Sequence, residues 1–247
     1  MHFIGRLTLL GLAVTLPLAA PAQSQNVFNV AVTPLVAWRT RDSLSLTYTV
    51  RVLPGSTDSL AAFVVDAPGT RLRVARPQPR TSWSTMNRFR KRPTAEWMLL
   101  ENLTTAGSST PPLAVTGVGV LDIVTYWAQP EAPVPIGETD TPADTVTSTD
   151  TIVDLKATIG KTIGIVMPAD RSPAGLASRL KGMIGEMCAL GWIDNAGVCN
   201  SLSVKAIPNA HTLAAMQHEL DAQRGKHVSE IAYAALTDNV TFLLAGL

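Results

Sequence analysis

The spacing of apolar residues changes along this chain, and the change divides it into two kinds of structure. Between Val27 and Trp127 apolar and polar residues alternate, most regularly from Leu44 to Val52. Alternation of this kind places one set of side chains on each face of a β-strand. After Ser172 the apolar residues recur every three or four positions, as they do on an amphipathic helix. We therefore predict an α+β protein of two domains.

The β-rich part is predicted over residues 23–129. Turn signals at Pro54-Gly55 and Pro68-Gly69 separate the candidate strands, and Leu60 to Val65 is apolar enough to be buried on both sides. The further candidate strands cover residues 70–76, 95–100, 113–120 and 123–127. Strands that recur about every ten residues, with turns between them, are typical of an antiparallel β-sandwich.

Residues 1–22 have the pattern of a secretory signal peptide. A short basic start with Arg6 precedes an apolar run, and Ala20-Pro21-Ala22 supplies small residues for cleavage. The run is shorter than the ~20 residues that span a bilayer. Nineteen basic and nineteen acidic residues follow the signal, so net charge indicates no polyanionic partner for the chain as a whole. We expect a secreted or periplasmic protein with no membrane span in the mature chain.

Residues 130–171 are predicted to be an acidic linker rich in Pro and Thr. Two short extended pieces within it, Ile152 to Leu155 and Lys161 to Met167, can return to the sandwich.

The last part, residues 172–247, is predicted to be a small antiparallel helical bundle. Ser172-Pro173 is a helix start, and Gly191 suits the left-handed position after that helix. Residues 194–197 are predicted to be a turn, with Asn200 or Ser201 capping a short second helix. The third and fourth helices are predicted from Asn209 to Arg224 and, with Ser229 as cap, from Glu230 to Leu244.

The two cysteines, Cys188 and Cys199, lie near the end of the first predicted helix and the start of the second. Because an even number of cysteines in an exported protein favours a disulfide, we predict that they are bonded. Two free, buried thiols are the alternative.

A basic stretch with interleaved aromatic residues lies between Asp66 and Glu96, where no acid occurs. Its cations, with Trp83 and Phe89 among them, form a candidate polyanion-binding site: Arg71, Arg73, Arg76, Arg80, Arg88, Arg90, Lys91 and Arg92. The alternative is a solvated loop and strand edge, where cations discourage aggregation. No specific nucleic-acid motif accompanies the stretch, so the candidate partner is an anionic glycan or another cell-surface component.

Four tryptophans occur in the β-rich part: Trp38, Trp83, Trp97 and Trp127. They are expected to fill its core and rims. The functional alternative is a platform on which carbohydrate stacks, but no two of them are spaced to share one exposed face.

The turn and cap residues of the helical part resemble those of the FIMAH-type helical domain of exported bacterial proteins. The resemblance covers about residues 174–247, in LGWIDNAGVCNSLSVKAIPNA and LDAQRGKHVSEIAYAAL. The matching positions are Ile193, Asn195, Gly197, Ser201, Leu202, Lys205, Gly225, Lys226 and Ser229. The resemblance implies a bacterial source, secretion and modular attachment, and it brings no catalytic residues; the β-rich part resembles no family that we identify.

No catalytic, metal or cofactor motif is found. His211 and His218 share a helix face, but two ligands do not make a zinc site. We therefore expect a non-enzymatic exported protein that serves in binding, adhesion or as an accessory structural part. One alternative is a polyanion- or carbohydrate-binding module that uses residues 71–92, and a second is a hydrolase with an unrecognised site.

Overall fold

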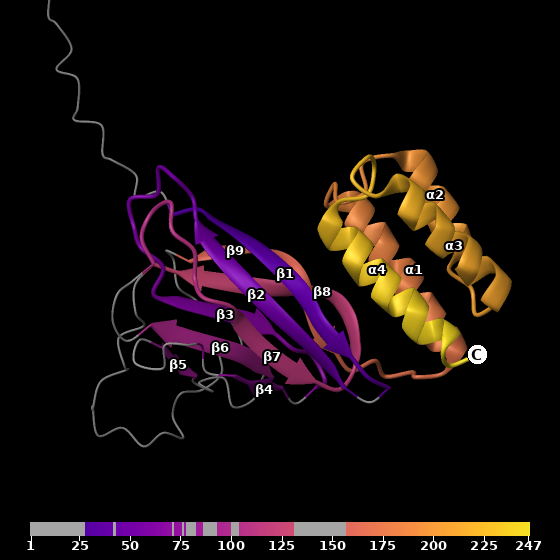
Figure 1. The fold of residues 1–247 in the computed structure, drawn as a ribbon, viewed down its shortest axis with the longest axis horizontal. Helices are drawn as coiled ribbons and strands as arrows, with labels where there is room; N and C mark the ends of the chain where they lie inside the picture. The colour runs from indigo at the N-terminus through magenta and orange to yellow at the C-terminus, as the bar shows by residue number, and fades with distance from the viewer. Residues whose placement is uncertain are drawn as a thin grey trace, which may run out of the picture.

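The computed structural model describes residues 28–41, 43–70, 72–75, 77, 83–85, 93–99, 104–130 and 157–247. It has the predicted α+β architecture, in which two antiparallel sheets form a β-sandwich and four helices form a bundle (Figure 1). The predicted signal peptide and most of the linker lie outside the described residues.

The first sheet has four strands in the order β1-β2-β7-β4. The strand predicted from the alternation between Leu44 and Val52 is present as β2, and its apolar residues are buried. The strands of this sheet are β1 (Val30–Arg39), β2 (Leu44–Val52), β4 (Arg73–Val74) and β7 (Leu113–Gly117).

The second sheet has five strands in the order β5-β6-β3-β8-β9. Its central strand β3 is buried along its whole length, as the apolar run from Leu60 to Val65 predicts, although the strand ends in the buried Asp66. The strands are β3 (Ala62–Asp66), β5 (Trp83–Thr85), β6 (Thr94–Leu99), β8 (Val120–Gln129) and β9 (Thr158–Val166).

Aromatic side chains fill the space between the two sheets. The rings of Tyr48, Phe63 and Trp97 lie 5.7–6.0 Å apart, and Tyr126 contacts Phe63 at 5.8 Å. The Tyr48 hydroxyl donates to the carbonyl of Ile163 at 3.0 Å, which joins the first sheet to β9. Because burial disfavours the phenolate, the pKa of Tyr48 is raised.

Strand β9 falls inside the range assigned to the linker. It pairs with β8 along nine residues, from Thr158 to Val166, and its second half is buried. The piece from Lys161 to Met167 therefore returns to the sandwich, whereas Ile152 to Leu155 lies outside the described residues.

The helical part contains four helices, three of them close to their predicted bounds. They are α1 (Pro173–Ala189), α2 (Ala196–Lys205), α3 (Ala210–Gln223) and α4 (Glu230–Leu244). Ser172 and Ser229 cap α1 and α4 as expected, and Asn209, predicted as the first residue of the third helix, is the cap of α3. Gly191, at φ +71°, ends the first helix in the left-handed conformation.

The predicted start of α2 was wrong. Neither Asn200 nor Ser201 is its cap; the helix begins at Ala196, and both residues lie within it. Asn195 is the cap, because its side-chain oxygen accepts from the backbone N–H groups of Gly197 and Val198 at 2.9 and 3.1 Å. The expected turn over residues 194–197 thus contains the cap of α2 and its first two residues.

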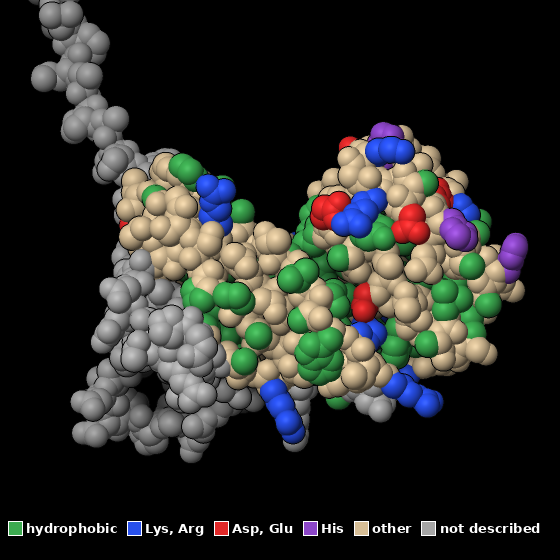
Figure 2. Space-filling view, in the orientation of Figure 1, with side chains coloured by type: hydrophobic (Ala, Val, Ile, Leu, Met, Phe, Trp, Pro, Cys, Tyr) green, Lys and Arg blue, Asp and Glu red, His purple; other side chains and the backbone are tan. Residues whose placement is uncertain are grey.

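The bundle lies beside one end of the sandwich, with α1 and α4 toward it and α2 and α3 on the far side (Figure 1). Contacts of α4 with β1 and β8, and of α1 with β8, join the two parts. The space-filling view shows the molecule hollowed between them on one side (Figure 2).

Candidate functional site

One extra residue in β1 sets the direction of the next two side chains. Val36 pairs with Leu46 but Trp38 pairs with Ser45, so Ala37 has no direct partner and forms a β-bulge. A bulge shifts the alternation of side chains by one position. Trp38 consequently lies on the outer face of the four-stranded sheet, and Arg39 is directed toward the helical bundle.

Trp38 starts a row of side chains that crosses the outer face. It pairs with Ser45, which pairs with Thr116, which pairs with Arg73. Directly paired residues project from the same face of a sheet. With a strand spacing of about 4.8 Å, the row spans about 14 Å from first to last Cα.

Apolar and hydroxyl side chains make up the rest of this face. Leu35, 63% exposed, pairs with Thr47 and through it with Ala114, and Trp38 is 46% exposed. Figure 2 shows hydrophobic side chains spread over this side of the sandwich, with Lys and Arg side chains toward its margins. We call the outward residues of β1, β2, β4 and β7 the outer face: Ala31, Thr33, Leu35, Trp38, Ser45, Thr47, Thr49, Arg51, Arg73, Ala114 and Thr116.

The exposure of Trp38 differs from that of the other tryptophans whose side chains are described in the sandwich. Trp97 and Trp127 are buried, as expected for core residues. Spacing alone did not identify Trp38, because strict alternation from Val30 onward would turn it inward. The signal for the bulge is the run Val36-Ala37-Trp38, in which no polar residue marks the outward position.

The basic stretch is only partly described. Arg73 is exposed on β4 and contributes to the outer face, and Trp83 lies on β5, where its side chain is not described. The other residues of that candidate site, with Phe89, lie outside the described residues: Arg71, Arg76, Arg80, Arg88, Arg90, Lys91 and Arg92.

The predicted disulfide is present. Cys188 near the end of α1 is bonded to Cys199 in α2, with Cα atoms 6.2 Å apart, and neither cysteine is free. The bond closes the segment that carries Trp192, whose backbone N–H donates to the carbonyl of Met187 at 2.9 Å.

Arg39 joins β1 to the helical bundle. Its Nε donates to Asp238 Oδ2 of α4 at 2.7 Å, and its Nη1 donates to the carbonyl of Gly119 at 3.2 Å. The guanidinium also lies over the ring of Phe242, 4.7 Å from its centroid. Gly119 suits this turn because its φ is +148° and a Cβ there would lie 2.3 Å from the carbonyl oxygen of Val166.

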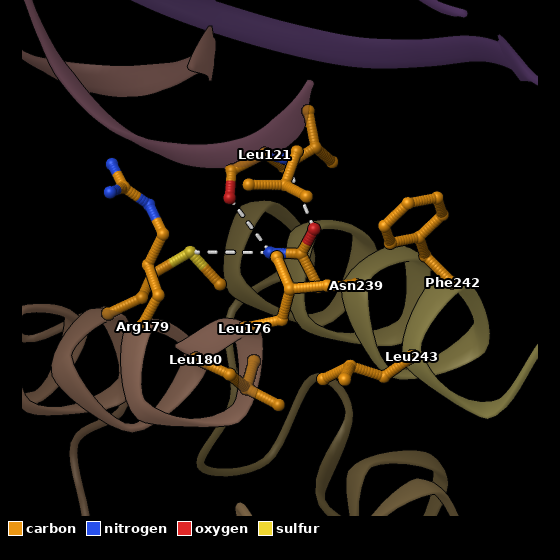
Figure 3. Close-up of a pocket in the computed structure, with 9 residues that line it drawn as sticks. Leu121, Leu176, Arg179, Leu180, Asn239, Phe242 and Leu243 are labelled. Atoms are coloured by element: carbon orange, nitrogen blue, oxygen red, sulfur yellow. Dashed lines mark hydrogen bonds between the residues drawn. The ribbon is translucent and has the colours of Figure 1, made fainter. Parts of the chain in front are cut away.

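Asn239 of α4 is buried against β8, and both ends of its amide are used (Figure 3). Its Oδ1 accepts from the N–H of Leu121 at 3.1 Å, and its Nδ2 donates to the carbonyl of Leu121 at 2.8 Å. The adjacent cavity, lined by Leu176, Leu180 and Leu243 among others, has a volume of about 10 Å³. That is about the space of one water molecule, so the junction is a packed contact.

An ion pair between Asp122 of β8 and Arg179 of α1 lies at the margin of the junction. Burial raises the pKa of Asp122 above its usual value, and the positive charge of Arg179 offsets part of that rise. A weaker pair, Lys161 with Glu186 at 3.6 Å, lies in more exposed surroundings.

The two histidines of α3, His211 and His218, are exposed. Within the described ranges, no group of three or more His, Cys, Asp or Glu residues could hold a metal ion. None of the helices described is both long and apolar enough to cross a membrane.

Neither the models of protein families nor the curated proteins gave a match to this chain. Among solved structures it is similar to an uncharacterized protein from Nocardia farcinica with an immunoglobulin-like fold. That alignment has 14% sequence identity and a TM-score of 0.30, and it covers 40% of this chain and 75% of the other.

Proposed function

We propose that this chain is an exported, non-enzymatic protein that binds an extended carbohydrate on the outer face of its four-stranded sheet. The observation that carries the proposal is the outward position of Trp38. A tryptophan with nearly half its surface in water leaves a large apolar ring available for contact. Pyranose sugars present C–H groups on their ring faces and hydroxyls around their edges, so they match such a ring surrounded by polar groups.

The neighbours of Trp38 support a sugar ligand in particular. Thr116 lies two strands from Trp38 in its row, and Thr47 pairs with Leu35 in the next row. Ser45, between Trp38 and Thr116, is buried, and its hydroxyl donates to the carbonyl of Val115 at 3.4 Å. Serine and threonine hydroxyls both donate and accept hydrogen bonds, as sugar hydroxyls do. An apolar side chain among hydroxyls on an open sheet suits a polymer that lies along the surface.

Two features support location outside the cytoplasm, secreted or periplasmic. The Cys188–Cys199 bond is of a kind that persists in oxidising compartments. The first residues have the composition of a signal peptide.

We also propose that the helical part is a FIMAH-type domain of a bacterial exported protein. Several of the matching positions have structural roles in the bundle: Asn195 and Ser229 cap helices, and Gly225 has a φ of +68°. Lys205 and Ser201 both contact the carboxylate of Glu219 in α3. These residues cap helices, form a turn and join α2 to α3, so the matching positions stabilise the bundle and carry no catalytic group.

Affinity electrophoresis through gels that contain hydroxyethyl cellulose, a soluble neutral β-glucan, tests the binding function. The wild-type protein should be retarded, and Trp38→Ala should weaken binding about tenfold, the size of a strong single contact. Trp38→Phe keeps a ring and should retain most of the affinity. Ile159→Ala, which removes a 58% exposed apolar side chain from β9, is the matched control. Unchanged retardation of Trp38→Ala, or none for the wild type, contradicts the proposal.

A further inference from the structure

The outer face carries positive charge and no negative charge. The strands β1, β2, β4 and β7 contain three arginines and no Asp or Glu. Arg39 is directed to Asp238, which leaves Arg51 and Arg73 on the outer face. Both are exposed, and neither forms an ion pair within the part of the chain that the structure describes.

The two arginines lie at different margins of the face. Arg73 ends the row that Trp38 begins, and Arg51 lies at the far end of β2, paired with Ala31. From Ser45 to Arg51 along β2 is about 20 Å at the usual rise of a strand. A polymer stacked on Trp38 can therefore reach either arginine with a later unit.

We propose that the ligand of this face is an acidic linear polysaccharide that stacks one sugar ring on Trp38 and pairs an anionic group with Arg73 or Arg51. This inference rests on the proposed carbohydrate-binding function and names the class of carbohydrate. Guanidinium groups hold carboxylates and sulfates with paired hydrogen bonds, so arginine suits either group.

Charge also argues against the other obvious occupant, a second copy of the chain. In a two-fold dimer formed through this face, the face would meet itself. The arginines of the two copies would then face a surface whose four strands supply no carboxylate. An acidic polymer supplies the opposite charge.

Two soluble polymers with the same β-glucan backbone test the proposal: neutral hydroxyethyl cellulose and carboxylated carboxymethyl cellulose. The wild-type protein should bind the carboxylated polymer more tightly. Because exposed charge pairs contribute about 0.2–1 kcal/mol, Arg73→Gln and Arg51→Gln should each weaken that binding by up to about fivefold. Neither change should alter binding to the neutral polymer, and Arg171→Gln, an exposed arginine after β9, should alter neither. About 1 M salt should remove the preference.

The outcomes separate the inference from the function on which it rests. Equal affinity for the two polymers, or arginine variants that behave like Arg171→Gln, overturns the acidic ligand. If Trp38→Ala still weakens binding to both polymers, the carbohydrate-binding function stands. A Trp38→Ala protein that binds both as the wild type does overturns both proposals. A dimer in light scattering that Trp38→Ala dissociates shows instead that a second copy covers the face.

Discussion

Asn239 is a polar side chain at an otherwise apolar contact between α4 and β8, and its amide is matched to the backbone of Leu121. Strand β3 pairs with β8 only between Tyr126 and Gln129, so it does not reach the start of β8. At the start of β8 the Asn239 side chain bonds both the N–H and the carbonyl of Leu121, as the backbone of a neighbouring strand would. A buried backbone N–H and C=O left without partners would cost free energy, so this residue fixes where the helix docks.

Replacing Asn239 by Ala should lower the free energy of unfolding by about 1–3 kcal/mol, since two buried backbone groups lose their partners. Asn239→Asp keeps the shape but removes the donor to the Leu121 carbonyl and adds a charge, so it should be at least as destabilising at neutral pH. Urea denaturation measures both changes. Asn200→Ala, an exposed asparagine of α2, is the control, and equal stability of the two alanine variants would contradict the role given to Asn239.

The pair Asp122 and Arg179 predicts a pH dependence. Burial raises the pKa of Asp122 in the folded protein, so this group favours the folded state most at low pH. That contribution is lost as pH rises from the usual carboxyl pKa through the raised folded pKa. The positive charge of Arg179 limits the rise in the pKa of Asp122. Without Arg179 the folded protein would therefore lose more stability at neutral pH.

Arg179→Gln should therefore lower the free energy of unfolding at pH 7 by about 1–3 kcal/mol, because it leaves a buried charge without its partner. The difference should shrink toward about pH 4, the usual carboxyl pKa, where Asp122 becomes protonated in both states. Chemical denaturation at the two pH values measures it, with Arg171→Gln as control. If Arg179→Gln destabilises the protein equally at both pH values, the electrostatic account of this pair is wrong.

At the scale of elements, patterns of several residues were predictable and single-residue irregularities were not. The alternation in β2 and the caps of α1 and α4 depend on local backbone preferences, which the sequence contains. The bulge at Ala37 depends on how β1 pairs with β2, so strict alternation from Val30 would give the wrong direction for Trp38. Asn195 was assigned to a turn because a turn and the first turn of a helix use the same residue types.

The disulfide ties two elements, and its removal should mainly affect the bundle. Closing the segment of sequence separation 11 between Cys188 and Cys199 stabilises a fold by about 2–4 kcal/mol. A Cys188→Ser/Cys199→Ser protein should lose about that free energy of unfolding, measured by urea denaturation. The wild type in reductant is the matched comparison, and binding to carbohydrate should be retained by both. Unchanged stability in the double variant would contradict the role of the bond.

In the molecule as a whole, the bulge links the candidate binding face to the docking of the bundle. Trp38 and Arg39 are adjacent, yet one lies on the outer face and the other contacts Asp238 of α4. The sequence indicated a sandwich and a bundle, but their junction depends on pairs far apart in the chain, such as Leu121 with Asn239, which no local pattern contains. The apolar run from Lys161 to Met167 predicted an extended piece that can return to the sandwich, but not that it would pair with β8.

The outer face as a carbohydrate-binding surface is tested most directly by a titration of the isotope-labelled protein with carboxymethylated cello-oligosaccharides, followed in amide and indole NMR spectra. The indole N–H signal of Trp38, assigned by its absence in Trp38→Phe, should shift together with amides of Leu35, Ser45, Thr47 and Thr116. Amides of α2 and α3 should stay in place. Shifts confined to the bundle or to the other sheet, or a Trp38 signal that does not move, would contradict the account.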